Sequence, residues 1–356
     1  MMTAKISYEG RRVYIGLDVH KSFYVLSAIS EGILVKSCRM KAEPIELTKF
    51  IRKNFSGGII ESCYESGFSG FHLHRVLTAG GINNIVVNPG SIETCSRNRV
   101  KTDKKDSKKL AKDLSEGRYR GIRIPSMEQE NARLLTRTRE QLVRSITRVR
   151  VQIRMKFHQF GLIDSVEHRV LSRRMVETIL LKEMSLELKA SIESLLSVWD
   201  SLVGEKKKLE SKMRCQAEKD PNETLWRSLP GIGAFSSRIL SNELGDLSQF
   251  PNERALFSFT SFTGLTPCEF SSGDRIHKGH ISRQGNSSLR HVLVEAAWRA
   301  IRIDRVLKED FNRIASRRGK KRAIVAIARK LVGRARAIFR TEGEYQLGYR
   351  KYKQCA

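Results

Sequence analysis

The chain has 356 residues, of which 66 are lysine or arginine and 38 are aspartate or glutamate, so its formal net charge is +28 at pH 7. A positive field of this size favours a polyanionic partner, and nucleic acid is the commonest one. No apolar run approaches the roughly 18 to 20 residues that span a bilayer, the N-terminus lacks the apolar core of a signal peptide, and the cysteines form no CxxC pair. We therefore expect a cytoplasmic protein with reduced thiols, associated with the nucleoid when bound to DNA and not with a membrane.

Residues 1–125 alternate strand-like and helix-like stretches and are expected to form one domain. The expected strands lie within residues 11–30 (two strands separated by a polar turn at His20–Lys21), 32–40, 57–66 and 82–89. The expected helices lie over residues 44–55 and 70–81 and in the segment that carries Asp103 and Asp106. Three strands followed by alternating helices and strands is the order of the ribonuclease H-like (RuvC-like) fold, so we predict an α/β domain.

Residues 126–218 show a helical pattern and are expected to form a helical hairpin or coiled coil. Apolar residues with spacings of three or four are Leu142, Ile146, Val149, Ile153, Phe157 and Phe160. A seven-residue recurrence follows at Leu188, Leu195, Leu202 and Leu209, flanked by Ile192, Trp199 and Met213 and interrupted by Lys206. Such patterns are typical of helices that pack on each other, so this region is expected to separate domains or to join protomers.

Residues 219–356 are expected to form a mostly helical domain with glycine-rich turns. The sequence LPGIG at 229–233 resembles the glycine turn of a helix-hairpin-helix, in which backbone N–H groups bind a DNA phosphate. Gly231 and Gly233 would let the backbone approach the phosphate closely. Residues 317–339 form a basic amphipathic segment that is expected to fold as one helix or two.

Carboxylates at the ends of predicted elements form the first candidate site. Asp103 and Asp106 are three residues apart on a predicted helix, so both side chains point in a similar direction. Asp18 ends one predicted strand, and Glu65 or Glu61 lies near the end of another. Mg²⁺ prefers oxygen ligands, and pairs of Mg²⁺ ions catalyse phosphoryl transfer in many nucleases, so converging acids predict a Mg²⁺ site.

Simpler readings of these acids are open at this point. The two helix aspartates could belong to a solvated face whose lysines neutralise them. Asp18 could cap a turn, and the surrounding IGLDVH also resembles the first strand of actin-like ATPases.

A second candidate site lies in the sequence SSGDR. Ser271 and Ser272 precede a glycine, and the cations Lys278, Arg283 and Arg290 follow. A serine in such a loop is usually only a turn residue, since a nucleophilic hydroxyl needs a base or metal ion nearby. The loop supplies cations that suit a phosphate but no evident base.

The motifs together resemble the IS110-type (DEDD) transposases. The resemblance is carried, in family order, by YIGLDVHK, YESGFSGFHLHRVLTAGG, NRVKTDKKDSKKLA, LPGIG, FTGLTP and SSGDR…KGHISRQGNSSLRHVLVEAAW. It selects Glu65 over Glu61 and implies that Asp18, Glu65, Asp103 and Asp106 form a RuvC-like Mg²⁺ site. It further implies that Ser272, with Ser271 as the other register, attacks DNA to form a phosphoserine link, assisted by the acidic domain of a partner protomer.

The resemblance also implies the partners of the chain. These would be donor and target DNA, a structured bridge RNA that guides both, and further copies of the chain in a dimer and a synaptic tetramer. The lysines around the helix acids (Lys101, Lys104 and Lys105) would then face phosphates. Two other functions compete: a junction-resolving endonuclease that uses only the acids and a water molecule, and a non-enzymatic protein that organises nucleic acid.

Overall fold

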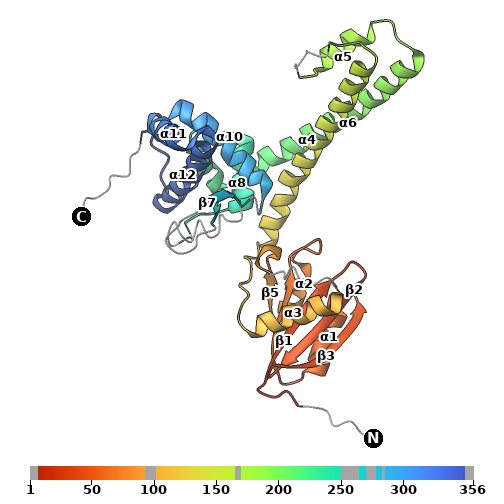
Figure 1. Ribbon diagram of the computed structural model, residues 1–356, viewed down its shortest axis with the longest axis vertical. Coiled ribbons are helices and arrows are strands. Elements are labelled where there is room, and N and C mark those ends of the chain that lie inside the picture. The colour runs from red at the N-terminus through yellow and green to blue at the C-terminus, as the bar shows by residue number, and fades with distance from the viewer. Residues whose placement is uncertain are drawn as a thin grey trace, which may run out of the picture. The chain divides into compact units, whose positions relative to one another are not determined.

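The computed structural model describes residues 7–92, 102–164, 170–248, 250, 264–269, 278–282 and 285–348. The chain divides into two compact units, Met1–Pro125 and Ser126–Ala356. Figure 1 shows that the first unit is built around a sheet and that the second is mainly helical. The α/β and α content expected from the sequence is confirmed.

The first unit contains a five-stranded mixed sheet in the order β3-β2-β1-β4-β5. Its strands are β1 (Arg12–Val19), β2 (Phe23–Ser30), β3 (Ile33–Lys41), β4 (Ile59–Glu65) and β5 (Asn83–Val87). Strand β2 is antiparallel to β1 and β3, whereas β1, β4 and β5 are mutually parallel. The helices are α1 (Pro44–Asn54), α2 (His72–Ala79) and α3 (Asp103–Ser115), and a short 3-10 turn, η1, covers Pro89–Ser91.

The alternation of side chains along β1 determines which helices cover which face of the sheet. Val13, Ile15 and Leu17 are fully buried in the core formed with α1 and α2. Because successive strand residues point to opposite faces, Tyr14, Gly16 and Asp18 face the other side, which α3 covers. The acids at the end of β1 and on α3 therefore share one face.

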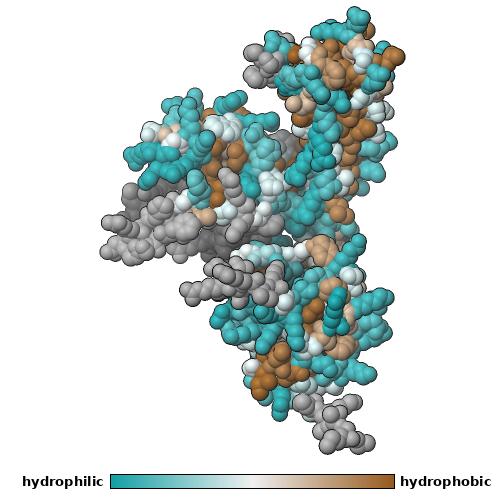
Figure 2. Space-filling view, turned by 45° about the vertical axis from the view of Figure 1, so that its right-hand side comes forward, coloured by the Kyte–Doolittle hydropathy of each residue, from teal (hydrophilic) through white to brown (hydrophobic). Residues whose placement is uncertain are grey.

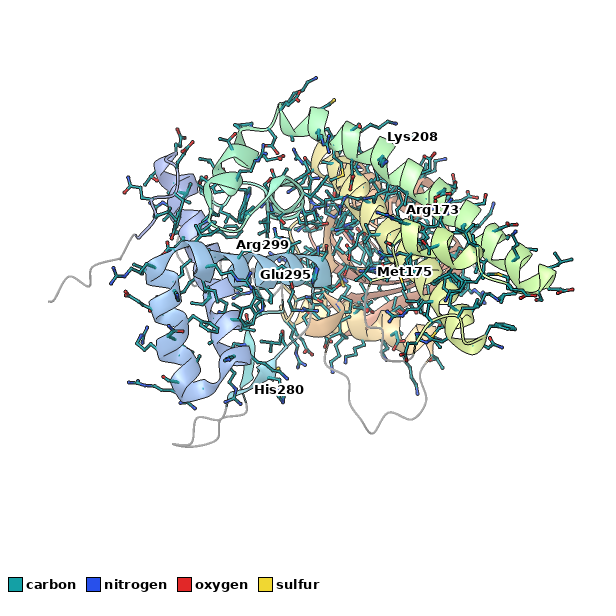
Figure 3. The ribbon with its side chains drawn as sticks, turned by 90° about the horizontal axis from the view of Figure 1, so that it is seen from above. Arg173, Met175, Lys208, His280, Glu295 and Arg299 are labelled. Atoms are coloured by element: carbon teal, nitrogen blue, oxygen red, sulfur yellow. The ribbon has the colours of Figure 1, made fainter. Side chains whose placement is uncertain are left out.

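The second unit begins with a long helical hairpin. Helices α4 (Met127–Gln159) and α6 (Leu186–Ala217) run side by side, and the short α5 (Arg173–Leu180) packs at their far end. The Arg173 guanidinium lies 3.0 Å from the Asp200 carboxylate of α6, and Met175 contributes to the hairpin core (Figure 3).

The buried seam of α6 differs from the seven-residue recurrence read in the sequence. Leu188, Ile192, Leu196, Trp199 and Met213 are buried, whereas Leu195, Leu202 and Leu209 are only partly covered. A straight α-helix repeats every 3.6 residues, so its contact stripe drifts away from a strict heptad. Phe160, the last residue of the apolar spacing read in α4, caps the C-terminus of that helix and is 53% exposed.

The polar interruption of the seam has a structural partner. Lys206 lies 3.5 Å from the Glu210 carboxylate, which also accepts a 2.8 Å hydrogen bond from Arg139 of α4. Apolar residues remain uncovered elsewhere on the hairpin, and Figure 2 shows hydrophobic side chains among the charged ones there. They include Val151, Met155, Leu181, Leu186 and Val198.

The rest of the second unit packs around its own apolar core. Its elements are α7 (Pro221–Ser228), α8 (Ala234–Leu244), β6 (Pro267–Glu269), β7 (Lys278–Ile281), α10 (Ser287–Ile303), α11 (Arg305–Arg318) and α12 (Lys320–Thr341). Trp226, Leu240, Leu293 and Leu331 lie at the centre of this core. The basic amphipathic segment begins in the last residues of α11 (Arg317 and Arg318) and continues, after Gly319, as α12, whose apolar stripe is buried. None of the described helices is both long and apolar enough to cross a bilayer.

Candidate functional site

Helix α3 lies unusually close to the sheet because small residues line their contact. A Cβ atom at Gly16 would lie 2.2 Å from the backbone oxygen of Ser107 and 2.4 Å from the backbone nitrogen of Ala111. The Ser27 and Ser107 hydroxyls are hydrogen-bonded at 2.9 Å in the buried contact. This contact fixes the first turn of α3 above the end of β1.

Three side chains meet where β1 ends and α3 begins. The His20 Nε2 atom lies 3.3 Å from Asp18 Oδ2 and 3.4 Å from Asp103 Oδ2. Asp18 and His20 are two residues apart and share a face, and Asp103 is the first residue of α3. Among the described residues, these three form a group whose potential ligand atoms all lie within 4.8 Å of one another.

Glu65 and Asp106 lie around this group rather than within it. Leu17 of β1 is in register with Tyr64 of the parallel β4, so Asp18 and Glu65 follow side by side on the two strands. The negative charge of Asp106 acts on Asp18 from the same turn of α3 that carries Asp103. The four acids predicted from the sequence thus occupy one end of one sheet face, with Asp18 and Asp103 in closest approach.

The electrostatics of Asp18 differ from those of a solvated carboxylate. Burial raises the pKa of Asp18, and the negative charges of Asp103 and Asp106 raise it further, while His20 acts in the opposite direction. Like charges held together disfavour ionisation unless a cation binds between them. The donor set therefore fits a divalent metal ion, since carboxylate oxygens are the ligands that hard cations prefer.

His20 was expected only in a turn between two strands, and its contact with the acids was not predicted from the sequence. The His20 ring stacks on Phe23, with centroids 4.4 Å apart, and the Arg39 guanidinium lies 3.6 Å from the Phe23 centroid. The His20 backbone N–H donates to the Phe23 carbonyl at 3.0 Å, which extends the β1–β2 ladder by one residue. The Asp-x-His spacing on a strand was the signal that could have identified it, because alternate residues share a face.

The lysines predicted to contact phosphates are partly described. Lys104 and Lys105 are exposed on the first turn of α3, next to the acids. Lys101, Arg283 and the serines Ser271 and Ser272 lie outside the described residues, as does the side chain of Lys278. Arg290 is half-buried on α10.

The two glycines of LPGIG have different surroundings. Gly231 has a φ of +82°, and a Cβ there would lie 2.4 Å from the backbone oxygen of Ala296 and 2.8 Å from the Cβ of Arg299. Close packing on α10, where Figure 3 labels Arg299, therefore requires a glycine at this position, and a phosphate contact at Gly231 stays a prediction. Gly233 is exposed at the N-terminus of α8, and a Cβ there would meet nothing within 4 Å. A phosphate contact at Gly233 stays a prediction.

Two family models match this chain. The IS110 DEDD model, described as a transposase, matches residues 15–175, and the model described as "Transposase IS116/IS110/IS902 family" matches residues 223–312. The first stretch includes the four acids, and the second includes Ser272.

Curated relatives match over most of their length. The transposase for insertion sequence element IS1533 of Leptospira borgpetersenii is 27% identical over 81% of this chain and 85% of its own. The putative transposase y4rJ of Sinorhizobium fredii is 29% identical over 90% of each chain. The transposase for insertion sequence element IS1111A of Coxiella burnetii is 25% identical over 94% of this chain and 91% of its own.

Proposed function

The chain belongs to the IS110 family of transposases, and from that premise we propose that it cleaves and rejoins DNA at the ends of an insertion sequence. The observation that carries the proposal is the approach of Asp18 and Asp103 at the end of β1, with Glu65 and Asp106 beside them. Asp18 and Asp106 are half-buried, and acids gathered this closely suit a cation.

The proposed cation is Mg²⁺, held by oxygens of Asp18, Glu65, Asp103 and Asp106. When bound, it would stabilise negative charge on the phosphoryl oxygens of the reacting strand. Lys104 and Lys105 on the exposed side of α3 would hold neighbouring phosphates by charge. The contact at Gly16 keeps Asp103 above Asp18, so the chain itself determines the spacing of the acids.

The proposed nucleophile is Ser272, with Ser271 as the other register, and this assignment rests on the family resemblance. The serine hydroxyl would lose its proton and attack phosphorus, forming a phosphoserine bond as a sugar oxygen leaves and takes up a proton. Attack by a sugar hydroxyl on that bond would reverse the step and join a new strand. The acidic unit of a partner protomer would act at the same phosphate.

The charge and surface of the chain support the proposed partners. A net charge of +28 suits donor and target DNA together with a bridge RNA, whose base pairing would supply the sequence specificity. Apolar residues uncovered on the hairpin, among them Met155 and Val198, support association with further copies of the chain in a dimer and a synaptic tetramer.

An assay for a covalent adduct tests the serine mechanism. The chain is co-expressed with the DNA that flanks its gene, and protease-sensitive protein–DNA adducts are compared between wild type, Ser272→Ala and Ser271→Ala. The proposal predicts an adduct that disappears in Ser272→Ala or, for the other register, in Ser271→Ala.

One specific observation favours a second function. The acids gather within a single unit, as a metal-dependent nuclease that activates water would require. If cleaved DNA forms without an adduct and both serine variants remain active, the junction-resolving endonuclease replaces the recombinase. If the wild type forms neither an adduct nor cleaved DNA, and Asp106→Asn binds nucleic acid as the wild type does, both enzymatic functions fail and the nucleic-acid-organising function remains.

A further inference from the structure

His20 occupies the position of a ligand in the acid group. Its Nε2 atom lies 3.3 Å from Asp18 Oδ2 and 3.4 Å from Asp103 Oδ2. Adjacent ligands of an octahedral ion with bonds of about 2.1 Å are roughly 3 Å apart. The His20 nitrogen is therefore within a few tenths of an ångström of ligand spacing from each oxygen. All three atoms lie within 4.8 Å of one another, so one ion could bind them together.

The ring is held in this orientation by contacts that do not involve the acids. It stacks on Phe23 with an interplanar angle of 28°, and Arg39 lies over the Phe23 ring in turn. The backbone of His20 is tied to Phe23 by a hydrogen bond of 3.0 Å. A ligand held by such contacts loses little freedom when it binds a metal ion.

We propose that His20 is a direct ligand of the divalent cation at Asp18 and Asp103, and that its nitrogen shifts the preference of the site from Mg²⁺ toward Mn²⁺. This inference rests on the proposed function, since it concerns the same cation. Mg²⁺ selects oxygen ligands almost exclusively, whereas imidazole nitrogen is a good ligand for transition metals. A group of two carboxylates and one imidazole is therefore expected to bind Mn²⁺ more tightly than four carboxylates would, relative to Mg²⁺.

The competing role for His20 is that of a hydrogen-bond partner that holds Asp18 and Asp103 together before the cation arrives. In that role His20 would separate from the acids, or remain beside them, without bonding to the metal. The two roles differ in one measurable property, which is whether a histidine nitrogen bonds directly to the bound ion.

Pulsed electron paramagnetic resonance of the full chain with substoichiometric Mn²⁺ measures that property. We expect hyperfine coupling to ¹⁴N, which changes to ¹⁵N coupling when the histidines are labelled with ¹⁵N. The coupling should disappear in His20→Ala and persist in His72→Ala, a matched control at an exposed histidine of the same unit. Loss of the ligand should weaken Mn²⁺ binding by at least about tenfold and Mg²⁺ binding by a smaller factor.

The possible outcomes distinguish a failure of the proposed role of His20 from a failure of the proposed metal site. Mn²⁺ that binds through Asp18, as judged by its loss in Asp18→Asn, but shows no nitrogen coupling would overturn the role of His20 and leave the metal site intact. Coupling that survives in His20→Ala would overturn it equally. Mn²⁺ binding that is absent, or unaffected by Asp18→Asn, would overturn the metal site and the inference together. If His20→Ala fails to fold, His20→Gln replaces it, and an absence of ¹⁵N coupling in the labelled wild-type chain would by itself overturn the role of His20.

Discussion

Carboxylates gather in both units, but their partners differ. In the second unit the buried Arg238 guanidinium donates to Glu223 at 3.0 Å and to Asp220 at 2.8 Å. In the first unit Asp18 and Asp103 approach each other with His20 between them. Burial raises the pKa of both Glu223 and Asp18, yet the charge of Arg238 counteracts it at Glu223, whereas Asp103 and Asp106 add to it at Asp18.

A second buried acid of the helical unit follows the same rule. Glu243, at the end of α8, accepts hydrogen bonds of 2.8 and 2.9 Å from Arg137 of α4. Arg133 also donates to the Glu243 backbone carbonyl at 2.8 Å, so this acid joins the hairpin to the helical core. Acids matched by arginines stabilise packing, whereas acids gathered beside one another prepare a site for a cation.

The largest expected effect is on chemistry at the gathered acids of the first unit. Asp103→Asn should reduce DNA cleavage by roughly a thousandfold, because a lost metal ligand removes several kcal/mol of transition-state stabilisation. The measurement is adduct formation or strand cleavage at fixed Mg²⁺. Lys108→Gln, an exposed change on the same helix, is the matched control and should retain activity within a few fold.

Removal of an arginine that pairs with buried acids should instead destabilise the second unit. Arg238→Met leaves the buried Glu223 and the partly buried Asp220 without their arginine and should lower the free energy of unfolding by about 3–5 kcal/mol. All three tryptophans (Trp199, Trp226 and Trp298) lie in this unit, so their fluorescence reports its unfolding. Arg305→Met removes a side chain that is 90% exposed in its pair with Glu309, and should change stability by under about 0.5 kcal/mol. Equal losses in the two variants would contradict the comparison.

Mg²⁺ should stabilise only the unit that carries the gathered acids. At a free concentration about a hundred times its Kd, a bound ion adds roughly 2.7 kcal/mol to the stability of its unit. Hydrogen exchange should therefore slow at the amides of β1 and α3, and the tryptophan signal of the other unit should not shift. Asp18→Asn should abolish the protection, and protection that persists there would place the ion elsewhere.

Substitution of Gly16 should disturb the spacing of the acids. Gly16→Ala puts a methyl group against the backbone of α3 and should cost about 1–3 kcal/mol through overpacking, measured by hydrogen exchange of β1. Gly233→Ala, which meets open space in the second unit, is the control and should be close to neutral. Mg²⁺ affinity should fall in the first variant and not in the second.

The smallest expected effect is a pH dependence of the stability of the first unit without a bound metal ion. Since the folded state raises the pKa of Asp18, it binds that proton more tightly than the unfolded chain does. The resulting stabilisation is complete below the ordinary pKa of aspartate and is lost as the pH rises through the raised value. Hydrogen exchange of β1 in wild type and Asp18→Asn should diverge over that range, with wild type losing stability as pH rises. Parallel profiles would show that Asp18 is not held among like charges.

The sequence predicted the sheet elements well and the contacts between elements less well. Strand alternation and turn residues are local, so the five strands and the helix beginning at Asp103 could be predicted from the sequence in order. The exchange of Leu195 for Leu196 in the α6 seam depends on how two helices cross, which a one-dimensional repeat does not determine. The contact of His20 with the acids was not predicted because it depends on Asp103, which is distant in sequence. The packing of Gly231 on α10 is likewise a long-range contact, so it could not be predicted from the sequence LPGIG.

Anomalous X-ray scattering from crystals of the full chain grown with Mn²⁺ would test the central claim most directly. We predict a peak bounded by Asp18, His20 and Asp103, on the side of Glu65 and Asp106, that is lost in Asp18→Asn. A chain with no peak there, and with Asp103 and Asp106 paired to the lysines of α3, would contradict the claim. The acids would then form a solvated helix face, as the simplest reading of the sequence allows.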